Sequence, residues 1–106
     1  MTADWGSFYR AVCERAGSLL TGLDDESAAV IGAAASSSDV FWSESLLATF
    51  EDFSAESPRA GVEAALEVWR ENVLEVFGDL LDLDRRAVRV APDAVDGLVG
   101  AGEPDG

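Results

Sequence analysis

The sequence predicts an all-α fold: a single domain that resembles a four-helix bundle, with a short extended C-terminal arm. Two observations predict it. Apolar residues recur at three- and four-residue steps over most of the chain, which is the period of an amphipathic helix. The 106 residues are also 48% hydrophobic, which is enough for one modest core. We therefore expect one helical domain over residues 1–99 and a flexible tail over residues 100–106.

The first two helices are expected on either side of Gly22. The second begins at Asp24 or Asp25, because either carboxylate can accept the free N–H groups of a first helical turn. Its apolar residues are mostly small, so we expect it to be wedged inside the bundle. The first helix, roughly 4–20, has this apolar stripe: Trp5, Phe8, Val12, Ala16, Leu19, Leu20 and Leu23.

The third helix is expected to begin after a polar break, with Ser38 or Asp39 as its N-cap. Its apolar stripe consists of Trp42, Leu46, Phe50 and Phe53.

Ser57-Pro58 predicts the start of the fourth and longest helix, about 58–82, because serine caps a helix and proline suits its first position. Leu74 and Leu81 lie away from its main stripe. This helix is therefore central in the bundle or carries a dimer interface. The main stripe is Val62, Leu66, Trp69, Val73, Val76, Phe77 and Leu80.

The period changes to two over residues 85–92, which is typical of a short strand or an extended arm. A single strand has no partner in a helical chain of this kind. We expect the segment to pair across a two-fold axis, to pack on the bundle or to continue as coil. The sequence allows one helical turn over residues 93–99.

The charge is strongly acidic. Seven basic residues, all arginine, stand against 21 acidic ones, for a net charge of −14. This charge repels nucleic acid and anionic lipid, so direct binding to either is not expected. It fits a halophilic cytoplasm, because the Debye length falls to about 3 Å at molar salt. One cysteine forms no internal disulfide, and Asp4 lies where a signal peptide needs basic residues, so we expect a cytoplasmic protein.

Catalytic residue types are scarce. The chain has no histidine, which removes the usual acid/base residue at neutral pH and the commonest transition-metal ligand. Cys13 has no histidine to activate it and is interpreted as structural. The glycine run 97–102 has no following helix to bind a phosphate. We expect no enzyme activity, no cofactor and no metal site.

Seven residues are the candidates for partner binding. Phe41 and Trp42 are adjacent, and neighbouring side chains on a helix point about 100° apart, so one of them, or Tyr9 next to Phe8, is expected to be exposed as an interface anchor. Arg85, Arg86 and Arg89 form a basic cluster that either binds a phosphate or an acidic partner, or neutralises nearby aspartates and the helix end. The other two candidates are Leu74 and Leu81.

The sequence thus predicts a non-enzymatic protein–protein interaction module: a small acidic adaptor or regulatory subunit that binds a protein partner or another copy of itself. The alternative is an acidic, antitoxin-like inhibitor that masks a basic nucleic-acid-binding partner. Affinity that falls with salt favours the second, and affinity that holds or rises favours the first.

Overall fold

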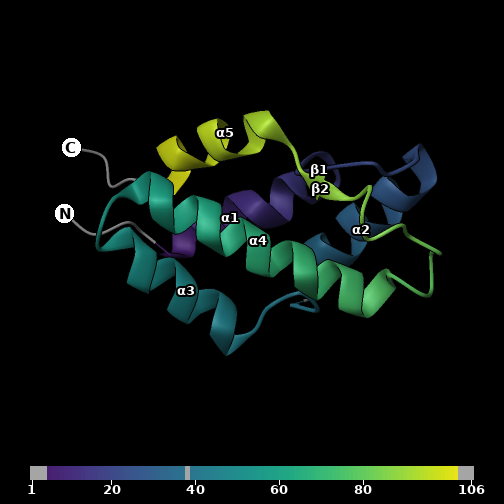
Figure 1. Cartoon of the computed structure of the whole chain (residues 1–106), viewed down its shortest axis with the longest axis horizontal. Helices are drawn as coiled ribbons and strands as arrows, with labels where there is room; N and C mark the ends of the chain where they lie inside the picture. Colours follow the sequence, from purple (N-terminus) through teal and green to yellow (C-terminus); the bar gives the residue numbers. More distant parts are fainter. Residues whose placement is uncertain (1–4, 38, 103–106) are drawn as a thin grey trace.

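The computed structural model describes residues 5–37 and 39–102 and consists mainly of α-helices (Figure 1). The all-α prediction is confirmed in this coarse form. The four-helix architecture is not, because the described residues contain a fifth helix and a small two-stranded sheet. The elements are α1 (Trp5–Arg15), the 3-10 turn η1 (Ala16–Ser18), β1 (Leu20–Thr21), α2 (Asp25–Ser37), α3 (Glu44–Ser54), α4 (Pro58–Phe77), β2 (Arg89–Val90) and α5 (Pro92–Gly102).

Helices α3 and α4 form an antiparallel hairpin, α5 packs against α1 and α4, and α1 also contacts α3 (Figure 1). The predicted start of α4 is confirmed: Pro58 begins the helix, and the Ser57 hydroxyl accepts the N–H of Ala60 at 3.0 Å. The two hairpin helices approach closely at Gly61, where a Cβ atom would overlap the Ser54 hydroxyl. The core contains Phe8, Val12, Ile31, Leu46, Phe50, Val62, Leu66, Trp69, Val73 and Leu98, all of which are at most 1% exposed.

Helix α2 begins where the sequence predicts but lies elsewhere. The Asp24 carboxylate accepts the N–H of Ser27 at 2.8 Å, and hydrogen bonds to Ser27 lower the pKa of Asp24. The expectation that α2 is wedged inside the bundle is wrong. It lies at one end of the molecule (Figure 1), where Val30 is 36% exposed. Its small residues permit a close approach to η1 instead, because a Cβ on Gly17 would lie only 2.8 Å from the Ala28 carbonyl oxygen.

Helix α3 begins later than predicted. Its N-cap is Ser43, whose hydroxyl accepts the N–H of Leu46 at 3.1 Å, and not Asp39. The other predicted cap, Ser38, lies outside the described residues. Because the helix begins at Glu44, Trp42 belongs to the preceding loop and does not join the core stripe.

The C-terminal arm finds a partner within the chain, so the expectation that it had none is wrong. Strand β2 pairs antiparallel with β1, with Leu20 opposite Val90 and Thr21 opposite Arg89. The predicted first helix, roughly 4–20, includes Leu20, but α1 ends at Arg15 and Leu20 belongs to β1. The chain bends sharply after β1, because Gly22 adopts a φ of +83°.

Helix α5 is longer than the single turn allowed by the sequence. Its residues Ala94 and Leu98 are buried, and the helix packs against α1 and α4. Residues 100–102, predicted as part of a flexible tail, continue the helix, and residues 103–106 lie outside the described part. No helix in the described ranges is long and apolar enough to cross a membrane.

Helix α4 ends at Phe77, before the predicted residue 82, although its winding persists for one more turn. The N–H of Leu81 bonds to the Phe77 carbonyl at 2.9 Å. The N–H of Leu83 then bonds to the Gly78 carbonyl at 2.8 Å, and that of Asp82 to the Asp79 carbonyl at 3.3 Å. This pair of bonds is a Schellman motif, and Asp82 takes its left-handed position with a φ of 54°.

Replacing Asp82 with glycine is expected to raise the free energy of unfolding by about 0.5–1 kcal/mol. Glycine adopts the left-handed conformation without steric cost, and the change removes a negative charge from a helix C-terminus. Urea denaturation followed by circular dichroism at fixed salt measures the effect. Asp79→Gly is the control, because Asp79 has no positive φ and should gain nothing from glycine. Equal effects of the two substitutions would contradict the Schellman assignment.

Candidate interaction surface

The loop between α2 and α3 presents an aromatic ring to solvent. Phe41 is 2% exposed, whereas its neighbour Trp42 is 42% exposed. The Phe41 ring packs edge-on against Trp69 and Phe77, with centroid distances of 5.8 and 5.7 Å. The prediction that one of the two adjacent aromatic residues is exposed is therefore confirmed, and Trp42 is the exposed one.

Asn72 holds this loop against α4. Its Nδ2 atom donates to the Phe41 carbonyl oxygen at 2.9 Å and to the Ser43 hydroxyl at 3.1 Å. The N–H of Trp42 donates to the Asp39 carbonyl at 3.0 Å. The backbone is thus fixed on both sides of Trp42, so little conformational freedom remains to be lost on binding. Asn72 is not among the residues predicted from the sequence, although it is the only asparagine in the chain and that rarity is a signal.

Trp42 forms part of a shallow groove between this loop and α4. The groove is lined by Val40, Trp42, Ser43, Asn72, Glu75 and Val76. Val40 and Val76 are 40% and 39% exposed, and Leu80, one turn after Val76, is 75% exposed. We call Val40, Trp42, Val76 and Leu80 the Trp42 surface. Adjacent exposed side chains of this kind mark interaction sites more often than isolated ones do.

Acidic residues lie in and near the Trp42 surface along the chain. Glu75 lines the groove itself, Glu44 begins α3, and Asp79 follows Glu75 by one turn. Residues 39–84 together contain twelve aspartates and glutamates and only two arginines. This part of the molecule therefore carries most of the net negative charge.

Both of those arginines already have carboxylate partners. Arg59 lies 2.6 Å from Asp96 and 3.2 Å from Glu63. Arg70 is the less exposed of the two, and its side chain is only 17% exposed. Neither guanidinium is therefore an unpaired charge that could neutralise the groove.

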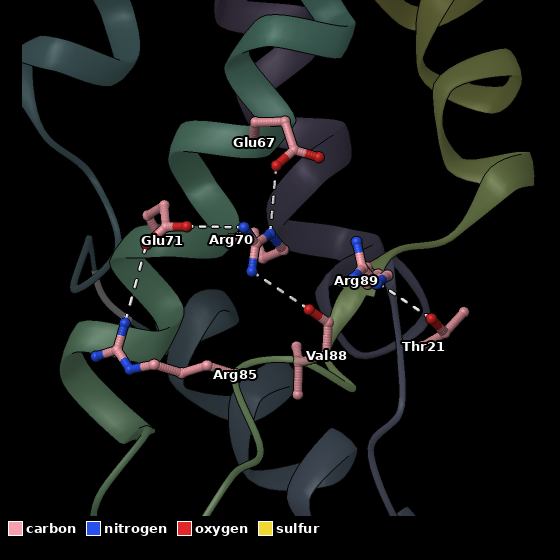
Figure 2. Close-up of polar contacts among 7 residues, drawn as sticks. All are labelled: Thr21, Glu67, Arg70, Glu71, Arg85, Val88 and Arg89. Carbon is pink, nitrogen blue, oxygen red and sulfur yellow. Dashed lines mark hydrogen bonds and ion pairs between the residues drawn. The ribbon is translucent and has the colours of Figure 1, made fainter.

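Arg70 also ties the C-terminal arm to α4 (Figure 2). It lies 3.3 Å from Glu67 and 2.7 Å from Glu71, and its Nη1 atom donates to the Val88 carbonyl at 3.3 Å. The sequence analysis did not single out this role. The available signal was the pair of glutamates at positions −3 and +1 from the arginine.

The three arginines of the predicted basic cluster reach different elements. The Arg85 guanidinium lies 3.9 Å from Glu71 on α4, whereas the Arg89 carbonyl accepts the Thr21 hydroxyl at 3.3 Å (Figure 2). The backbone N–H of Arg86 donates to the Asp84 carboxylate at 2.9 Å. The ion-pair partner of Arg85 is thus a glutamate on α4 and not one of the aspartates at the helix end.

The prediction that Leu74 and Leu81 contact a partner is wrong, because both residues are withdrawn into or against the core. Leu74 is 1% exposed and belongs to the core, and Leu81 is partly buried against it. Helix α4 is covered by α3, α5 and β2, so the second apolar side that suggested a dimer interface is largely used within the chain. Phe41 is also buried and therefore does not contribute to an exposed surface.

Cys13 and Tyr9, two other chemically notable side chains, are partly buried. Burial raises the pKa of the half-buried Cys13, which disfavours its reactive thiolate at neutral pH. Burial also raises the pKa of Tyr9, whose hydroxyl donates to Asp39 at 3.4 Å. The glycine run 97–102 lies within α5, and no three acidic or thiol side chains among the described residues are placed to hold a metal ion.

Comparison with protein-family models found no match, and searches of curated proteins and of solved structures found none either.

Proposed function

We propose that this protein is a non-enzymatic protein–protein interaction module, an adaptor or regulatory subunit that binds through the Trp42 surface. The observation that supports it most is the Trp42 ring, which is 42% exposed on a loop held by two hydrogen bonds from Asn72. Aromatic residues in fixed positions beside a groove are frequent energetic centres of interfaces. The bound molecule is a protein partner or a second copy of this chain.

The alternative is an acidic inhibitor that masks a basic nucleic-acid-binding protein. One specific observation favours it: twelve carboxylates and two arginines, both already paired, lie within residues 39–84. Affinity based on these charges falls steeply with salt, whereas affinity based on the Trp42 surface holds or rises. In either case we propose a reducing cytoplasm as the setting, and a salt-rich one accounts for the acidic composition.

Trp42→Ala is expected to abolish partner binding without unfolding the protein, because the ring contributes to the surface and not to the core. Tagged wild-type and variant proteins are used to purify partners from an extract of the source cells at native salt. Light scattering at the same salt measures self-association. The wild type should retain a stoichiometric partner or form a dimer, and Trp42→Ala should lose whichever complex is observed.

Phe53→Ala is the matched control for this experiment. Phe53 is 47% exposed, but it lies near the other end of α3, outside the Trp42 groove. The Phe53→Ala variant should bind the partner as the wild type does. A complex that Trp42→Ala retains in full would contradict the proposed binding surface.

A further inference from the structure

We infer that the Trp42 surface binds an amphipathic segment of another protein that carries arginine or lysine, and not a second copy of this chain. This inference rests on the proposed function and adds the chemical class of the partner. It follows from the position of Glu75 beside Trp42 and from the charge of the surrounding helices.

The groove places a carboxylate beside an exposed aromatic ring. Glu75 lines it from α4, and Trp42 lines it from the loop between α2 and α3. A guanidinium or ammonium group in this groove would face the ring and pair with the carboxylate, which combines a cation–π contact with a charge-assisted hydrogen bond. The two arginines of this region are already paired with other carboxylates. The cation must therefore come from the partner.

The partner segment also needs apolar residues beside its cation, because they must cover the apolar part of the Trp42 surface. Val40 and Val76 line the same groove, and Leu80 follows Val76 by one helical turn. A partner helix can meet both kinds of group, because residues three and four positions apart project from the same face. The complementary segment is thus an amphipathic one with basic residues flanking its apolar stripe.

The same charges disfavour a second copy. A two-fold contact centred on this groove would bring the Glu75 carboxylates of the two copies towards each other, on a hairpin with a large acidic excess. Opposed like charges suppress an interface, whereas opposite charges select a partner and accelerate its association. Charge complementarity therefore favours a basic partner over self-association.

Selection from a displayed library of random 16-residue peptides tests this inference without assuming a partner. The intact protein is the target, and Trp42→Ala serves for counter-selection, so that only peptides dependent on Trp42 are kept. We expect enrichment of sequences that combine arginine or lysine with apolar residues three or four positions apart. Their binding should weaken only slightly as salt is raised, because salt screens the single ion pair at Glu75 while the apolar contacts hold or strengthen.

The selected peptides are then measured against a pair of charge variants. Glu75→Gln should weaken binding about threefold to tenfold, the effect of losing one exposed ion pair together with its support of a cation–π contact. Glu51→Gln should leave affinity unchanged, because Glu51 is exposed on α3 but does not line the groove. An equal effect of the two substitutions would overturn the assignment of the cation to this groove.

The outcomes separate this inference from the proposed function. Peptides that depend on Trp42 but are acidic or uncharged would overturn the basic partner and leave the interaction module standing. If no peptide that depends on Trp42 is recovered, the inferred partner class is overturned. If Trp42→Ala also keeps every complex that the wild type forms, the proposed function fails as well. A dimer that requires Trp42 would assign the surface to a second copy and overturn the inference.

Discussion

Replacing Trp69 with alanine is expected to lower the free energy of unfolding by about 3–5 kcal/mol. Trp69 is 1% exposed on the central helix α4, and the Phe41 ring packs edge-on against it at 5.8 Å. Removing the indole deletes a large buried apolar group and leaves a cavity that the neighbouring helices cannot fully close. Because domains of this size are stable by about 5–15 kcal/mol, such a loss is a large fraction of the total.

Urea denaturation followed by far-ultraviolet circular dichroism, at one fixed salt concentration, measures this effect. Trp42→Ala is the matched control, because it removes the same side chain from a position that is 42% exposed. Its free energy of unfolding should stay within about 0.5 kcal/mol of the wild type. Similar losses for the two variants would show that the core and the surface have been assigned incorrectly. Trp69→Ala should also weaken binding, since Phe41 positions the loop of Trp42.

Gly22→Ala is expected to destabilise the fold by about 2–4 kcal/mol, the combined cost of a strained backbone and an overpacked contact. Gly22 has a φ of +83°, and a Cβ atom there would overlap the Ala87 carbonyl oxygen. The same atom would lie 3.2 Å from the Val88 backbone nitrogen. The backbone of the C-terminal arm cannot move away without disturbing its pairing with β1.

Gly32→Ala is the control for this substitution. Gly32 lies inside α2, where a Cβ atom would approach other heavy atoms no closer than 3.6 Å. Alanine should stabilise this helix by up to about 1 kcal/mol. Thermal unfolding and hydrogen exchange of the β1 and β2 amides measure both variants, which should shift in opposite directions. A neutral Gly22→Ala would mean that the arm does not pair with β1.

Local features of the chain were predicted from the sequence alone. The start of α4 follows from Ser57 and Pro58, because a cap and a fixed φ act within one helical turn. The exposure of one of the two adjacent aromatic residues is predicted correctly but for the wrong reason, because Phe41 and Trp42 lie in the loop before α3 and not on a helix. The absence of histidine is likewise a property of composition, and it needs no structure to be stated.

Contacts between distant residues were decided by the tertiary structure. The chain pairs Thr21 with Arg89, and no pattern in either segment specifies a partner 68 residues away. Asn72 selects Trp42 as the exposed ring only because α4 and the loop of Phe41 meet in space. Periodicity reports which face of a helix is apolar but not what covers it, so Leu74 was interpreted as a contact residue although it lies in the core. Helix signals are local and legible in the sequence, whereas burial and strand pairing depend on the packing of the whole chain.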